Sequence, residues 1–164
     1  MKKTKSNKDG LTIRALTARD AYQYFQIAQE DPDMMRFTNF FVVKSIEEAR
    51  KKIVSYTTNY EVIYGLFTKS NRLVAVFDVN DDFDEDGAID GAVVHYFVGR
   101  KYRGNNYAYR GIKKLAVEFA HEYIKFKFEV RKTNHASIAV QAKLGSEIDK
   151  AYVSKDCNLF VYNI

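Results

Sequence analysis

The segment that most constrains the fold joins an apolar strand, a basic loop and a long amphipathic helix. We expect residues 93–98 to form the strand and residues 99–104 the loop, and the helix to continue to about residue 124. Backbone N–H groups at a helix start have no partner within the helix, and the helix dipole is positive there, so such a start binds anions. Arg100, Lys101 and Arg103 add positive charge, and Gly104 lets the backbone approach a ligand closely. The segment therefore predicts a phosphate-bearing ligand at the head of this helix.

Length and composition predict one domain with a substantial core. The chain has 164 residues, of which 46% are hydrophobic and 29% charged. We expect residues 1–10 to be a disordered basic tail and residues 11–164 to be the domain. The single cysteine, Cys157, excludes an internal disulfide and a cysteine-based zinc site, and we expect no metal. Neither a signal peptide nor a membrane span stands out, which favours a cytoplasmic protein with no membrane partner.

The net charge of +5 is compatible with three kinds of partner: nucleic acid, a membrane surface or a small polyanion. Basic residues are concentrated between residues 100 and 114. A small phosphorylated ligand explains that concentration as well as nucleic acid does. Because no nucleic-acid-binding motif stands out, we expect no nucleic-acid partner.

Hydrophobic periodicity predicts a mixture of strands and helices. The predicted strands cover residues 11–16, 60–68, 72–80, 93–98, 126–131, 147–153 and 158–162. The predicted helices run from residue 17 to just before Pro32, over residues 46–58, from the basic loop to about residue 124, and over residues 134–145. Hairpins are thus mixed with crossovers, which predicts an α+β fold with a mixed sheet.

Two segments remain open to more than one interpretation. Residues 33–44 are apolar without clear periodicity, so they either cover the core as a connection or form a wall of an acceptor pocket. Residues 81–90 are strongly acidic and lie just before the central strand. They form either a solvated hairpin loop or a surface that attracts a cationic acceptor.

Two motifs together resemble a known family. The run Arg103-Gly104-Asn105-Asn106-Tyr107-Ala108 resembles the acyl-CoA signature of the GNAT superfamily of N-acetyltransferases, with Asn106 where glycine is usual. Asparagine tolerates positive φ better than most residues, so the turn is expected to survive. The family's second segment, N-x-x-S/A…K-x-G, is matched by Asn134, Ser137, Lys143 and Gly145. The resemblance covers residue 11 to the C-terminus and is strongest to the branch that acetylates ribosomal proteins.

The resemblance implies that acetyl-CoA is the cosubstrate and that its binding site lies between splayed central strands. It implies a mostly antiparallel sheet of six to seven strands flanked by about four helices. Pantetheine would pair with backbone near Val98, which would also supply an oxyanion donor, and pyrophosphate would lie on the helix start. The implied acetyl-CoA contacts are Phe97, Val98, Gly99, Arg103, Gly104, Asn105, Asn106, Tyr107, Ala108, Asn134, Ser137 and Lys143.

The catalytic residues are less well defined, because the family's usual tyrosine acid corresponds to Gln141, which cannot act as an acid. The glutamate base of many members falls near Asp90, which is either a turn residue or a water-linked base. His95 is either a packed strand residue or the base. Ser137 either assists the thiolate or bonds to backbone at a helix start. Asn134 is a helix cap, a CoA contact, or both.

The predicted function is acetyl transfer to a primary amine, on a protein N-terminus or a small molecule, by direct attack on the thioester. A CoA-binding module without catalysis is the first alternative, because Gln141 and Asn106 depart from the family pattern. A nucleic-acid-binding protein is the second. Either a monomer or a homodimer is compatible with the sequence.

Overall fold

A computed structural model describes residues 9–29, 32–38, 41–58 and 62–164. The strands are β1 (Thr12–Ala15), β2 (Val62–Phe67), β3 (Leu73–Phe83), β4 (Ile89–Val98), β5 (Lys125–Arg131), β6 (Glu147–Ile148) and β7 (Cys157–Asn163). The α-helices are α1 (Ala21–Gln29), α2 (Pro32–Phe37), α3 (Ile46–Thr58), α4 (Tyr107–Phe119) and α5 (His135–Leu144). Two 3₁₀ turns are η1 (Ala18–Asp20) and η3 (Arg100–Tyr102).

The strands form one seven-stranded sheet in the order β1-β2-β3-β4-β5-β7-β6. All neighbouring pairs are antiparallel except β4 and β5, which are parallel. A parallel pair needs a crossover connection, and here α4 supplies it. The mixed, mostly antiparallel α+β fold that the sequence predicts is therefore confirmed.

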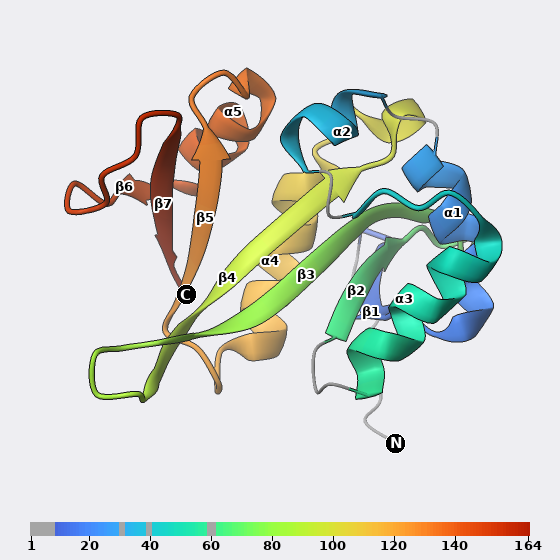
Figure 1. Ribbon diagram of the computed structural model, residues 1–164, viewed down its shortest axis with the longest axis horizontal. Coiled ribbons are helices and arrows are strands. Elements are labelled where there is room, and N and C mark those ends of the chain that lie inside the picture. The colour runs from blue at the N-terminus through green and yellow to red at the C-terminus, as the bar shows by residue number, and fades with distance from the viewer. Residues whose placement is uncertain (1–8, 30–31, 39–40, 59–61) are drawn as a thin grey trace.

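The parallel pair is short, and this defines the opening of the sheet. Two register positions join β4 and β5: Ala92 lies opposite Phe126, and Val93 lies opposite Lys127. Beyond them the two strands diverge, as Figure 1 shows. The splayed central strands implied by the family resemblance are thus present.

The sheet carries a hydrophobic core on each face. One cluster joins the sheet to α4 through Ile112, Leu115 and Phe119. The other joins it to α1 and α3 through residues such as Tyr24 and Ile53. In Figure 1, α3 lies in front of the sheet and α4 behind it. Helices on both faces therefore hold the diverging strands in place.

Close contact between α4 and the sheet depends on Gly111. A Cβ atom at this position would lie 2.1 Å from Cζ of Phe77, a fully buried ring of β3. That separation is far below van der Waals contact, so a larger residue would force α4 away from β3.

Several boundaries differ from those that the sequence predicts. Pro32 begins α2 instead of only ending the preceding helix, and proline is well suited to a first helical position. The helix α4 ends at Phe119, five residues early. β3 and β4 extend into the acidic segment, which leaves a turn of residues 84–88. β6 covers two residues, whereas the sequence predicts a strand over 147–153.

The predicted disordered tail covers residues 1–10, but Asp9 within it contacts α4. Asp9 accepts hydrogen bonds and forms ion pairs with Arg110 and Lys114 of α4. The chain is therefore docked on α4 from Asp9 onward. Residues 1–8 of the predicted tail, and residues 60–61 of the predicted second strand, lie outside the described residues.

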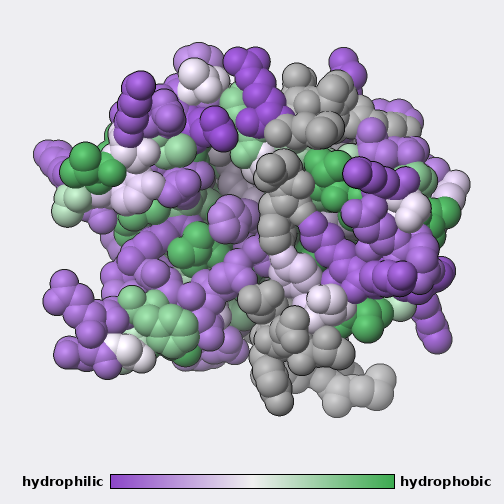
Figure 2. All heavy atoms as spheres, viewed as in Figure 1, coloured by the Kyte–Doolittle hydropathy of each residue, from purple (hydrophilic) through white to green (hydrophobic). Residues whose placement is uncertain are grey.

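The surface in Figure 2 is largely hydrophilic, and its hydrophobic residues occur as separate small patches. Exposed apolar side chains such as Val117 on α4, Ile124 before β5 and Val153 before β7 come from different segments. Within the described ranges, no helix has the length and apolar character that crossing a membrane requires.

Candidate active site

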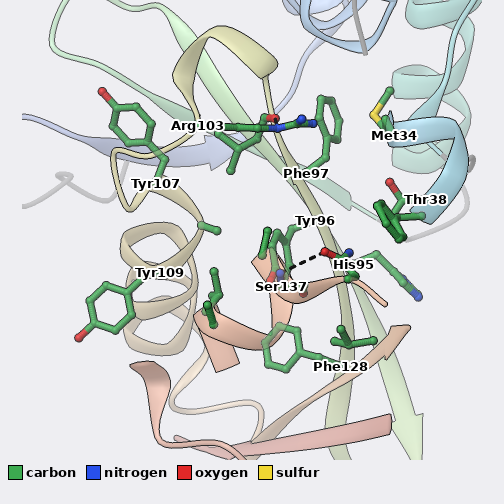
Figure 3. A pocket seen from close by; sticks show the side chains of 18 of the residues that line it. Met34, Thr38, His95, Tyr96, Phe97, Arg103, Tyr107, Tyr109, Phe128 and Ser137 are labelled. Atoms are coloured by element: carbon green, nitrogen blue, oxygen red, sulfur yellow. Dashed lines mark hydrogen bonds between the residues drawn. The ribbon is translucent and has the colours of Figure 1, made fainter. Parts of the chain in front are cut away.

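The opening between β4 and β5 is part of a cleft with a volume of about 770 Å³. Its walls come from β4, the β4–α4 loop, the start of α4, β5, α5 and the segment around α2. In Figure 3, Arg103 and Tyr107 lie on one side and Met34 and Thr38 on the other, with Tyr96 and Ser137 between them. The cleft thus connects the basic loop to the point where the strands part.

The loop before α4 has two left-handed residues. Gly104 has φ of 81° and Asn106 has φ of 58°. The expectation that asparagine tolerates the usual glycine position is therefore confirmed. Open space surrounds a Cβ built on Gly104, so its backbone conformation, and not crowding by protein atoms, is what requires glycine there.

The start of α4 is not capped by its own N-cap side chain. Asn106 makes no side-chain capping bond, and its Oδ1 instead accepts a hydrogen bond from Lys143 Nζ at 2.9 Å. Lys143 comes from the last turn of α5, so the two motifs singled out in the sequence meet here. The first turn of α4 and two cations, Arg103 and Lys143, therefore line the cleft together, at a helix start whose backbone N–H groups have no partner within the helix.

The second motif forms the start and end of α5. Asn134 caps this helix, because its Oδ1 accepts a hydrogen bond from the Ser137 N–H at 3.2 Å. Gly145 ends the helix in the left-handed conformation, with φ of 75°. The two predicted cap positions are confirmed, and they direct the Ser137 side chain at β4.

The Ser137 hydroxyl lies 2.7 Å from the hydroxyl of Tyr96, and either group can be the donor. Burial raises the pKa of Tyr96, while the side chains of Ser137 and Gln141 oppose this shift. The phenol therefore stays protonated at neutral pH, and the pair forms a neutral donor site in the cleft.

Gln141 occupies the position of the family's usual acid and has a structural role. Its side chain is fully buried, and its Oε1 accepts a hydrogen bond from Ser146 Oγ at 2.8 Å. An amide side chain has no titratable proton, so Gln141 cannot replace the acid.

His95 lies on the neighbouring position of β4 and also lines the cleft. Its Nδ1 is 3.5 Å from Oδ2 of Asp78, which is directly opposite on β3. His95 and Tyr96 are consecutive residues of β4, so their side chains point to opposite faces of the sheet, and both line the cleft where the strands part.

The apolar segment that the sequence left open both covers the core and lines the cleft. Phe41 and Val43 are buried with α1 and α3. Met34, Phe37, Thr38 and Phe41 line the cleft on the side opposite the basic loop. Both interpretations therefore hold for different side chains of this segment, although residues 39–40 lie outside the described part.

Three predicted site residues do not line the cleft: Gly99, Asn105 and Asp90. Asp90 lies near the start of β4, and the parting of the strands faces the other end. A hydrogen bond from Lys125 lowers the pKa of Asp90, so its carboxylate is engaged and weakly basic. The remaining predicted residues are brought together at the cleft, namely His95, Phe97, Val98, Arg103, Gly104, Asn106, Tyr107, Ala108, Asn134, Ser137 and Lys143.

The acidic segment lies away from the cleft and is largely engaged. Tyr123 donates to Asp81, and Lys127 and Lys125 pair with Asp82 and Asp90. The carboxylate of Asp84 accepts hydrogen bonds from two backbone N–H groups of its own turn. These contacts favour the solvated-hairpin interpretation over a surface for a cationic acceptor.

Sequence reasoning did not single out Tyr96, Asp78 or the cleft side of β5. Tyr96 appears in the sequence as one aromatic residue among many in an apolar strand. Strand alternation predicts that the side chains of Tyr96 and His95 point to opposite faces of the sheet. The contact of Tyr96 with Ser137 depends on how α5 packs, which the sequence does not show. Asp78 within an otherwise apolar strand was a usable signal, because a charge in a buried strand requires a partner.

Among the described residues, no group of three or more His, Cys, Asp or Glu side chains is placed to hold a metal ion.

The profile of the acetyltransferase (GNAT) domain family matches residues 10–147. The chain belongs to the GNAT acetyltransferase family. No curated protein sequence matches the chain. Solved structures that resemble it include an acetyl transferase from Salmonella typhimurium that modifies the N-terminal serine of a ribosomal subunit protein (TM-score 0.75, 19% identity, 94% of this chain and 95% of that one).

Two further solved structures share the fold of this GNAT enzyme. One is a putative ribosomal-protein-serine acetyltransferase from Vibrio cholerae (TM-score 0.71, 17% identity, 96% of this chain and 95% of that one). The other, yncA from Salmonella typhimurium, contains its cofactor acetyl-CoA (TM-score 0.67, 13% identity, 94% of this chain and 93% of that one). At these identities the likeness establishes the fold.

Proposed function

We propose that this GNAT enzyme transfers the acetyl group of acetyl-CoA to a primary amine by direct attack on the thioester. The observation that carries the proposal is the course of the cleft. It runs from the uncapped start of α4 to the Tyr96–Ser137 hydroxyl pair, through the gap left where β4 and β5 part.

The residues of the cleft suit the two chemically different parts of acetyl-CoA. The pyrophosphate is an anion, and the first-turn amides of α4 with Arg103 and Lys143 offer donors and positive charge. The pantetheine arm is an extended amide chain, and the edge of β4 beyond Val93 is no longer paired with β5. That edge can pair with an extended chain as a strand would.

In the proposed reaction, His95 accepts a proton from the acceptor ammonium, which leaves a neutral amine. The amine nitrogen then forms a bond to the acetyl carbon, and the carbon–sulfur bond breaks. The attacking nitrogen releases its second proton as the amide forms, the leaving thiolate takes up one proton, and Ser137 with Tyr96 stabilises the thiolate by hydrogen bonding. The net products are the acetylated amine, CoA and one proton.

The charge of the cleft favours an acceptor with a single amine, such as a peptide N-terminus. Among the side chains that the structure describes, Glu129 is the one acidic residue that lines the cleft, and its carboxylate already accepts a hydrogen bond from Tyr152. Arg103, Arg131 and Lys143 are basic. A polycation such as a polyamine or an aminoglycoside would meet repulsion there. Solved structures that share the fold act on, or are named for, ribosomal proteins, which supports a peptide acceptor.

The decisive experiment is acetyl-CoA turnover with a panel of amines, measured as release of free CoA and as the mass gain of the acceptor. We expect turnover with peptides that have a free N-terminus and none with the same peptides blocked at the N-terminus. Faster turnover of spermidine than of every peptide would contradict the acceptor class. CoA binding without turnover of any amine would establish a binding module instead.

A further inference from the structure

A carboxylate is buried beside the cleft, and the proposed reaction does not yet use it. Asp78 is 2% exposed, in the middle of an apolar stretch of β3. Its Oδ1 accepts no hydrogen bond from the described residues. Placing a charged group out of water costs free energy unless a specific partner compensates for it. The partners of Asp78 therefore indicate what it does.

The partners of Asp78 are on its own strand and on the strand that lines the cleft. Asn80 Nδ2 donates to Asp78 Oδ2 at 2.6 Å and so holds the carboxylate in one orientation. The same Oδ2 atom lies 3.5 Å from Nδ1 of His95. Asp78 and His95 are directly opposite in the register of β3 and β4, so their side chains project on the same face of the sheet.

The other charged groups near Asp78 come from α1 and α3. Lys52 of α3 lies close enough that the carboxylates of Glu48 and Asp78 oppose the lowering of its pKa by burial. Burial raises the pKa of Tyr24 of α1, and Tyr56, Asp78 and Glu48 raise it further. Tyr24 belongs to the buried cluster that α1 and α3 form on this face of the sheet. His95, in contrast, has 41% of its side chain exposed and lines the cleft.

We propose that Asp78 is a positioning residue, which holds His95 with its proton on Nδ1 so that Nε2 is the atom that accepts the proton of the acceptor amine. This inference rests on the proposed acetyl transfer and adds a second residue to it. A carboxylate at Nδ1 fixes the tautomer of an imidazole and stabilises the imidazolium that forms when Nε2 takes a proton. The distance of 3.5 Å is longer than a hydrogen bond, and such contacts often tighten when substrate binds.

The atoms of the step balance without any further reactant. Nε2 of His95 uses its lone pair to take one proton from the acceptor ammonium, and the imidazolium later gives that proton to water. The step moves no proton to or from Asp78. Its effect on the rate is therefore exerted only through His95.

The test compares the wild type with Asp78→Asn, His95→Gln and the double variant. Asparagine has the shape of aspartate but lacks its charge, so CoA affinity by calorimetry and the thermal unfolding midpoint check that the fold is kept. We expect kcat to fall on the order of 100-fold or more in His95→Gln, because a general base contributes about 10²- to 10⁴-fold. We expect a fall on the order of 10- to 100-fold in Asp78→Asn, with the acid limb of the pH–rate profile moved to lower pH.

The double variant and a matched control separate positioning from a structural role. If Asp78 acts through His95, then Asp78→Asn causes no additional loss in the His95→Gln background. Asp82→Asn removes another carboxylate of β3, which pairs with Lys127 away from the cleft, and should leave kcat unchanged. Equal losses from Asp78→Asn in both backgrounds, or an unmoved pH profile, would overturn the proposal.

A tautomer measurement decides the inference even if no amine is turned over. The chain has three histidines, so the imidazole ¹⁵N signals of His95 can be assigned by substitution. We expect His95 to carry its proton on Nδ1 in the wild type and to lose this preference in Asp78→Asn. A proton on Nε2 in the wild type, or no change on substitution, would refute the positioning role. Absence of acetyl transfer with this tautomer present would refute the proposed function alone.

Discussion

The hydroxyl groups of Tyr96 and Ser137 lie 2.7 Å apart, across the cleft between β4 and α5. This contact joins two elements at the place where β4 and β5 no longer pair. Asn134, which caps α5, accepts a hydrogen bond from the Ser137 N–H, so the serine is held through its backbone as well as its side chain. A hydroxyl held in this way is preorganised to donate to a charge that develops in the cleft.

Replacing Ser137 by alanine or Tyr96 by phenylalanine should lower kcat while CoA affinity is retained. Each change removes one hydroxyl from the donor pair, and a single lost donor to a developing charge costs on the order of 10²- to 10³-fold in kcat. Because the two hydroxyls act as one unit, kcat of the double variant should be only slightly lower than kcat of the more impaired single variant. Steady-state kinetics and CoA calorimetry measure the two quantities.

Tyr22→Phe is a suitable control, since this tyrosine is 56% exposed on α1. Its kcat should equal that of the wild type. Multiplicative losses in Ser137→Ala/Tyr96→Phe would show that the two hydroxyls act independently.

Replacing Gly104 by valine should weaken CoA binding without a steric clash. The φ of 81° is strained for any side chain with a Cβ, by about 1–2 kcal/mol, so the loop before α4 should shift. Gly87→Val is a matched control: Gly87 has φ of 80° and equally open surroundings, but it lies in the β3–β4 turn. Both variants should lose similar stability in urea, and calorimetry should show weaker CoA binding in Gly104→Val alone.

Local features of this fold could be predicted from the sequence because local chemistry determines them. The alternation of β5 is an example: Phe126, Phe128 and Val130 are buried as predicted. The cap of α5 at Asn134 and its end at Gly145 are others. The sequence predicts only the helix end before Pro32 and not α2 itself, because a six-residue helix is too short to show a helical period.

The site was less predictable, since it depends on register and packing between distant segments. The pairing of Asp78 with His95 follows from which residues of β3 and β4 lie opposite each other. A shift of one residue would have placed them on different faces. Asp90 is near the start of β4, where β4 pairs with β5. The cleft opens at the other end of β4, where the two strands diverge.

Replacing Asp20 by asparagine should destabilise the fold at neutral pH by about 1–3 kcal/mol. Burial alone would raise the pKa of Asp20, but hydrogen bonds from Arg14 and Thr17 outweigh it and the pKa is lowered. A lowered pKa means that the carboxylate stabilises the folded state above its ordinary pKa of about 4, and that this contribution is lost as the pH falls through the folded pKa.

The difference in free energy of unfolding between wild type and Asp20→Asn should therefore be largest at pH 7 and shrink at pH 3. Urea unfolding at the two pH values measures it. Asp86→Asn, in the turn between β3 and β4, is the control and should have no such effect. A difference that is constant with pH would mean that the charge of Asp20 does not contribute.

Replacing Gly111 by alanine should destabilise the fold, although alanine is normally the better helix residue. The new methyl group would lie 2.1 Å from Phe77 Cζ, so α4 must move or the ring must turn, at a net cost of about 1–3 kcal/mol. The Phe77 ring also packs against Tyr96, with 6.1 Å between ring centroids, so the displacement reaches the cleft and should lower kcat too.

Phe77→Leu should relieve the clash, so the double variant should lose less stability than the sum of the two single losses. Urea unfolding of the four proteins measures this coupling, and Val117→Ala on the exposed face of α4 is the control. Additive losses would show that Gly111 and Phe77 are not in the close contact from which the prediction is derived.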